Sequence, residues 1–162
     1  VDALVTRSPA VALGVYVADC APVLVADPEA RVVAAVHAGR GGLVAGVVQA
    51  AVEAMVGLGA QPSRLHAVVG PCIAAASYEV PAAMRDDVAA VVPVAAGRTS
   101  DGTPAVDLAA GVRAVLAGCG VAEVRLDGRD TYREPSLCSH RRAVHAGAPA
   151  TGRFLCVVRL VG

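Results

Sequence analysis

The chain has 162 residues, a formal net charge of zero and a hydrophobic fraction of 56%. This length suits one domain with a sizeable core, and the balanced charge argues against a nucleic-acid-binding surface. The mean hydropathy is +0.59, but uncharged stretches such as 41–52 are shorter than the roughly 18 residues of a transmembrane helix. We therefore expect one domain over residues 1–162, a monomer with no nucleic-acid or membrane partner.

The predicted elements intermix strands and helices without regular βαβ alternation. Short Val-rich runs bounded by turn residues predict strands, in chain order, at 2–6, 11–17, 21–26, 32–36, 65–70, 121–126 and 154–160. Apolar periodicity and capping residues predict helices at 42–55, 81–91 and 107–117, the last with Asp107 as its N-cap. The segments 57–63, 93–104 and 145–149 are predicted loops, and 127–139 is a polar connection. This pattern predicts an α+β fold with mixed β-sheets and flanking helices.

The first chemical signal is a cysteine and a histidine in neighbouring predicted strands. Cys20 stands at the start of one strand and His37 at the end of the next, with turn residues between the two strands. Antiparallel pairing of these strands would place the thiol and the imidazole at one end of the sheet.

Three interpretations of this pair stay open on residue types alone. Cys and neutral His are both good Zn²⁺ ligands. A Cys beside a His can also act as an activated nucleophile. The third interpretation is structural, with Cys20 as a small buried hydrophobe and His37 as a satisfied core residue.

Several short motifs, in order along the chain, resemble the polyphenol-oxidase (laccase-like) family, also called the YfiH-like or peptidoglycan-editing-factor family. The motifs that carry this resemblance are Val17-Ala18-Asp19-Cys20, Asp27-Pro28-Glu29, His37-Ala38-Gly39-Arg40-Gly41-Gly42-Leu43, Gly70-Pro71-x-Ile73, Tyr78-Glu79-Val80, Arg129-x-Thr131-Tyr132, Ser139-His140-Arg141-Arg142 and Thr151-Gly152-Arg153. The resemblance covers essentially the whole chain. It implies an α-β-β-α layered sandwich.

The resemblance implies that Cys20 and His37 are catalytic residues and two ligands of a zinc ion. The family's third ligand is a His in a segment upstream of Asp2, so we expect this 162-residue chain by itself to bind zinc weakly. Asp19 is either an outer-shell carboxylate that orients His37 or the zinc-bound water, or a turn cap.

Four further residues are candidates for binding substrate or phosphate. Arg40 departs from the family's Trp-Arg pair, but its guanidinium suits an oxyanion. The glycines around it form either an anion nest or a tight turn. Asp130 stands where the family has a Cys, and Arg141 and Arg142 match the family's Ser-Tyr-Arg-Arg segment. Each of these four also has a structural interpretation, as a solvated surface charge.

The function implied by the resemblance is a zinc-dependent purine nucleoside phosphorylase acting on adenosine, inosine or guanosine with phosphate, and adenosine deamination is also attributed to the family. One alternative is a Cys–His hydrolase of a peptidoglycan precursor. The other is a non-catalytic binding remnant. Copper oxidase activity is not expected, because the sequence has no His-rich multicopper constellation.

The five cysteines indicate the compartment. They are odd in number and have no CxxC spacing, which is typical of a reducing environment. We therefore expect a cytoplasmic protein without disulfides. The chain begins with a strand-like segment and without Met, so we also expect that an N-terminal segment of the family is missing here.

Overall fold

The computed structural model describes residues 2–161, so Val1 and Gly162 of the predicted domain lie outside it. Its centre is a five-stranded mixed sheet with strand order β1-β4-β3-β5-β8. The strands are β1 (Ala3–Thr6), β3 (Ala21–Asp27), β4 (Val32–Ala38), β5 (His66–Val69) and β8 (Glu123–Leu126). All pairs are antiparallel except β5 with β8, which is parallel.

Two smaller sheets complete the β structure. They are the antiparallel pair of β2 (Ala12–Val17) with β9 (Phe154–Arg159), and the hairpin of β6 (Ala96–Arg98) with β7 (Pro104–Val106). The hairpin lies inside the predicted loop 93–104 and its flank, where short segments without periodicity gave no strand signal.

The helices are α1 (Arg40–Val44), α2 (Val47–Gly57), α3 (Ala82–Val91), α4 (Leu108–Gly118) and α5 (His140–His145), with single 3₁₀ turns at Pro62–Arg64, Ala75–Ser77 and Pro93–Ala95. The predicted helix 42–55 is two helices, because Gly46 adopts the left-handed conformation at φ 81°. Asp107 caps α4 as predicted and accepts from the Ala110 amide. Helix α5 was not predicted; it begins after Ser139, whose hydroxyl accepts from the Arg142 amide.

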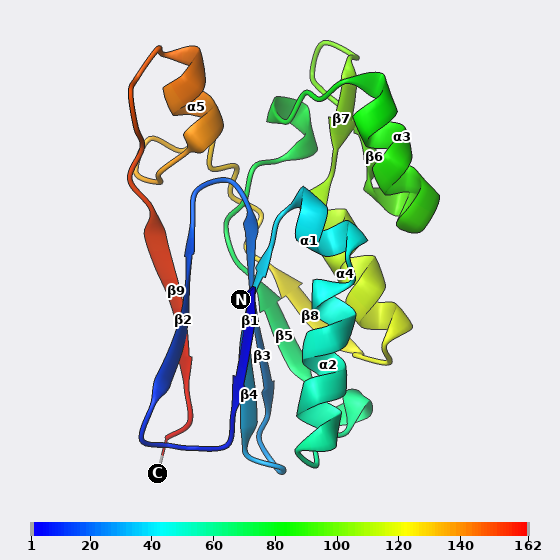
Figure 1. Ribbon diagram of the computed structural model, residues 1–162, viewed down its shortest axis with the longest axis vertical. Helices are drawn as coiled ribbons and strands as arrows, with labels where there is room; N and C mark the ends of the chain where they lie inside the picture. The colour runs from blue at the N-terminus through cyan, green and yellow to red at the C-terminus, as the bar shows by residue number, and fades with distance from the viewer. Residues whose placement is uncertain (1, 162) are drawn as a thin grey trace.

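The layers are helix, sheet, sheet. Helices α1 to α4 lie on one side of the central sheet and the β2–β9 pair lies on the other (Figure 1). Six of the seven residues of β4 are apolar, as expected for a strand with both faces covered, and His37 is the exception. Val36 packs with the helices, whereas Ala35 packs with Leu13 and Val15 of β2. The predicted α+β class with mixed sheets is confirmed.

Candidate functional site

The β3–β4 pairing brings the predicted cysteine and histidine to one sheet end. Pro22 is opposite His37 and Ala21 is opposite Ala38, in the antiparallel register that the sequence predicted. One residue further, Cys20 lies against Gly39, where an added Cβ would be 2.8 Å from the Cys20 sulfur. Cys20 and His37 are thus diagonal neighbours at one end of the sheet.

Cys20 and His37 line one cavity of about 250 Å³. It lies where the end of β2, the turn into β3, the end of β4, the start of α5 and the segment before β9 meet. Its lining residues are Tyr16, Val17, Ala18, Cys20, His37, His140, Thr151 and Arg153. An aromatic ring, a thiol, two imidazoles, a hydroxyl and a guanidinium therefore share one small cavity.

The orientation of His37 comes from Asp2, not from Asp19 as considered from the sequence. The His37 Nδ1 lies 3.3 Å from the Asp2 Oδ1 at the start of the chain. A carboxylate on one ring nitrogen fixes the tautomer and leaves the other nitrogen, Nε2, for a ligand. No sequence motif marked Asp2, because its proximity to His37 arises only from the pairing of β1 with β4.

Asp19 instead connects three distant segments beneath the cavity. Its Oδ1 accepts from the Thr131 hydroxyl at 2.7 Å and its Oδ2 accepts from the Arg141 amide at 2.6 Å. Its own carbonyl accepts from the Ile73 amide. Asp19 is buried and has φ 86°, a left-handed conformation that Asp tolerates better than most residues. This buried carboxylate holds the turn that presents Cys20.

The surroundings of Cys20 favour the neutral thiol. Burial raises the pKa of Cys20, and the nearby carboxylates of Asp19 and Asp2 raise it further. Nucleophilic cysteines are activated by the opposite shift, toward the thiolate. This environment argues against the Cys–His hydrolase, whereas a bound metal cation would itself deprotonate the thiol.

The donors at the sheet end fit part of a zinc site. A thiol and an imidazole with a carboxylate behind it are a donor set that zinc accepts. Among residues 2–161, however, no group of three or more His, Cys, Asp or Glu side chains is placed to hold a metal ion. Within the described chain the arrangement therefore offers two candidate ligands, Cys20 and His37, and zinc stays a prediction.

Arg40 and Arg141 contribute positive charge near Tyr78. The Arg141 guanidinium lies 5.1 Å from the centre of the Tyr78 ring and donates to the Glu79 carbonyl at 2.7 Å. Burial raises the pKa of Tyr78, as does its neighbour Cys20, while Arg141 and Arg40 oppose the rise. The two arginines thus lie within electrostatic reach of Tyr78, beside Cys20.

Arg142 anchors a loop. Its Nη1 donates to the carbonyls of Thr131, Tyr132 and Glu134 at 2.6–3.2 Å, and its Nη2 donates to the Leu137 carbonyl. These four bonds hold the connection that leads into α5 and occupy the guanidinium. The substrate contact predicted for Arg142 stays a prediction that these bonds do not favour.

Asp130 is similarly occupied. Its Oδ1 accepts from the amides of Ala74 and Tyr132, and its Oδ2 accepts from the Ser77 hydroxyl at 2.6 Å. It pairs by a parallel bridge with Cys72. Asp130 therefore joins two loops. Within residues 2–161, the Cys20–His37 cavity is lined by a set that includes none of Arg40, Asp130, Arg141 and Arg142.

His140 and Arg153 are cavity residues to which the sequence analysis assigned no role. Both stand inside motifs of the resemblance. The residues predicted from those motifs were Arg141 and Arg142, whose side chains instead donate to backbone carbonyls. Spacing gave no signal, since α5 and the segment before β9 are far in sequence from Cys20.

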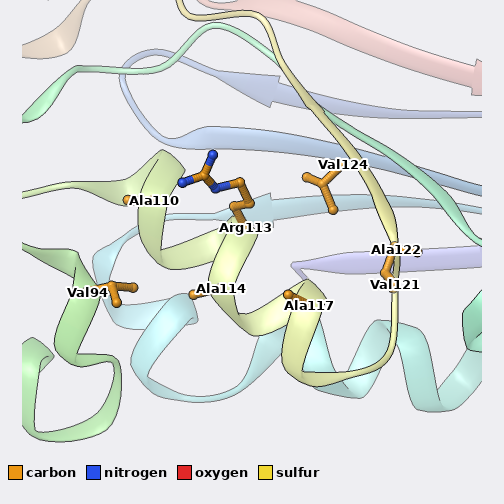
Figure 2. A pocket seen from close by; sticks show the side chains of 8 residues that line it. All are labelled: Val94, Ala110, Arg113, Ala114, Ala117, Val121, Ala122 and Val124. Carbon is orange, nitrogen blue, oxygen red and sulfur yellow. The ribbon is translucent and has the colours of Figure 1, made fainter.

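A second hollow, of about 400 Å³, lies between α4 and β8 (Figure 2). Its lining is alanine and valine except for Arg113, from α4. It lacks the thiol and imidazoles of the smaller cavity, so we place the candidate chemistry at Cys20 and His37.

Within the described chain all five cysteines are free thiols. None of its helices is long and apolar enough to cross a membrane.

The fold and site define an α+β layered protein with a Cys–His pair at the end of a mixed sheet. A family model described as multi-copper polyphenol oxidoreductase laccase matches residues 1–161. The chain therefore belongs to this family, which includes the YfiH-like proteins.

Relatives and solved structures agree with this assignment. A Streptomyces coelicolor protein named purine nucleoside phosphorylase is 57% identical over 145 residues, 90% of this chain and 57% of the relative. A Mycobacterium bovis protein of the same name is 49% identical over 157 residues, 97% of this chain and 61% of the relative. A Neisseria meningitidis crystal structure aligns with TM-score 0.85 and 33% identity, covering 99% of this chain and 65% of that one. The chain thus spans about three fifths of the length of the relatives it matches.

Proposed function

We propose that the protein is a zinc-dependent purine nucleoside phosphorylase, with adenosine, inosine and guanosine as substrates and the cytoplasm as its compartment. The observation that carries this proposal is the convergence of Cys20 and His37 in one cavity. Its support from comparison is that relatives 44–57% identical to the chain over the aligned residues are named purine nucleoside phosphorylases.

In the proposed reaction, a phosphate oxygen forms a bond to C1′ of the ribose while the bond between C1′ and N9 of the purine breaks. The base leaves with the bonding electrons and takes up a proton, and ribose 1-phosphate remains. The site must therefore hold an anion beside a flat base. Tyr16, exposed over the cavity, offers an aromatic face for that base.

Cys20 and His37 would hold the zinc ion, which supplies Lewis-acid chemistry when bound. The carboxylate of Asp2 keeps the His37 ring in place through Nδ1. Arg40 and Arg141 supply positive potential around Tyr78, which favours an anionic substrate. The third zinc ligand is proposed to come from the upstream His segment that the family resemblance implies.

The test is base release from inosine with phosphate, measured with the zinc content of the same samples. A version of the protein that carries the upstream segment should hold zinc and release base, and the 162-residue chain should do both poorly. Cys20→Ala and His37→Ala should each abolish activity. The double variant should lose no more than either single one, because the two residues act as a unit.

Cys119→Ala is the matched control, since Cys119 is also a free, half-buried thiol but lies at the end of α4, outside the cavity. It should keep zinc and activity. If the extended protein holds stoichiometric zinc yet releases no base from any of the three nucleosides, the phosphorylase proposal is wrong.

A further inference from the structure

The segment before β9 forms part of the wall of the Cys20–His37 cavity. In the β2–β9 ladder, Val17 is opposite Phe154. Continuing this antiparallel register by one residue sets Arg153 opposite Ala18, and both residues line the cavity. A basic residue from the far end of the sequence thus contributes to the wall of the site.

Two neighbours of Arg153 add hydrogen-bonding groups to the same cavity. Thr151 contributes a hydroxyl and His140, the first residue of α5, contributes an imidazole. The path of this segment is constrained at Gly152, where an added Cβ would lie 3.0 Å from the Cys138 sulfur. Because the backbone passes so close to the residues before α5, Thr151 and Arg153 are held at the wall beside His140.

Arg153 lines the cavity and, unlike Arg141 and Arg142, has a guanidinium available for a ligand. Arg40 is also unengaged within residues 2–161, but it does not line the cavity. Arg141 donates to a backbone carbonyl and lies over Tyr78, and Arg142 is engaged by four carbonyls. Within residues 2–161, by contrast, no hydrogen bond or ion pair engages the side chain of Arg153. A guanidinium is always charged and presents a planar pair of donors that matches phosphate oxygens.

We propose that Arg153 is the direct phosphate-binding residue of the cavity, assisted by the Thr151 hydroxyl and the His140 imidazole. The identity of the anion as inorganic phosphate rests on the proposed function. A nucleoside 5′-monophosphate is a second source of the same group. Arg40 and Arg141, two of the residues that sequence analysis predicted for this task, do not line the cavity.

The experiment measures binding of inorganic phosphate to the full-length protein by calorimetry, for the wild type, Arg153→Gln and Arg153→Lys. Loss of hydrogen bonds to a charged group costs about 1.5–3 kcal/mol, so Arg153→Gln should weaken binding roughly 10- to 100-fold. Arg153→Lys should lie between, because it keeps the charge without the planar fork. Arg159→Gln, at the far end of β9 from Arg153, is the control and should bind phosphate as the wild type does.

Thermal melts of each variant verify the fold, and kinetics separate this proposal from the proposed function. The Michaelis constant for phosphate should rise in Arg153→Gln while that for inosine stays the same. If phosphate binds through Arg153 but no nucleoside is cleaved, the phosphorylase proposal fails and the phosphate site stands. If cleavage proceeds with an unchanged Michaelis constant for phosphate in Arg153→Gln, the phosphate site is wrong and the phosphorylase stands.

Two binding results would also overturn the assignment. One is a wild-type protein that does not bind inorganic phosphate. The other is a protein that binds inosine 5′-monophosphate through Arg153 while inorganic phosphate does not compete, which would identify a nucleotide site instead.

Discussion

The turn between β3 and β4 is held by one buried carboxylate, that of Asp27. Its Oδ1 accepts from the amides of Glu29 and Ala30 at 3.0 and 2.9 Å. Its Oδ2 accepts from the Gln61 amide at 2.9 Å and from the Arg64 guanidinium at 2.9 Å. The side chain has no exposed surface. Because this turn sets the β3–β4 register, it also sets how Cys20 and His37 meet.

We expect Asp27→Asn to lower the free energy of unfolding by about 3 kcal/mol at pH 7. Burial alone would raise the pKa of Asp27, but hydrogen bonds from Arg64 and two backbone amides outweigh it and lower the pKa to about 2. One pKa unit corresponds to about 1.4 kcal/mol, so the charge accounts for roughly 2 kcal/mol. The NH₂ group of Asn would face backbone N–H donors and leave them unsatisfied, which lowers the free energy of unfolding by about 1 kcal/mol more.

The sign of the pH dependence follows from the lowered pKa. The stabilisation by Asp27 is complete above the unfolded pKa near 3.8 and is lost as pH falls through about 2. Urea unfolding at pH 7, 4, 3 and 2 should therefore show a difference between wild type and Asp27→Asn that is constant down to about pH 4 and then shrinks. A difference that is the same at pH 7 and pH 2 would refute the role of the charge. Asp86→Asn, an exposed carboxylate on α3, should change stability by less than about 0.5 kcal/mol.

Two further changes test the site itself. Gly39→Ala forces the Cys20 sulfur out of its position, so the zinc affinity of the extended protein should fall at least tenfold and the free energy of unfolding should drop by about 1–3 kcal/mol. The control is Gly41→Ala, which has nothing within 4 Å of its added Cβ and should keep the zinc. Equal zinc loss in both variants would contradict the proposed contact. Asp19→Asn keeps a residue type that tolerates φ 86° but loses one carboxylate oxygen as an acceptor. Hydrogen exchange of the Arg141 amide should therefore quicken by about tenfold or more. Unchanged exchange would show that this hydrogen bond does not hold the start of α5.

The sequence by itself was sufficient for the strands that carry the site. The Val-rich runs of β3 and β4 are joined by a short turn at Asp27-Pro28, which favours pairing of these two strands with each other, so the juxtaposition of Cys20 and His37 followed from local pattern. The same local logic found Asp107 as a helix cap. The short elements, such as α5 and the β6–β7 hairpin, lacked enough residues for a periodic signal.

The tertiary structure decided which side chains surround the pair, because those contacts join segments that are remote in sequence. Asp2 reaches His37 only through the β1–β4 pairing, and Arg153 reaches the cavity only through β2–β9. Likewise, a motif cannot tell whether a guanidinium is available or already engaged, as Arg142 is by the carbonyls of its own loop. Residue type and order along the chain determine the chemistry that is present, while long-range strand pairing determines which groups meet and which remain available to a ligand.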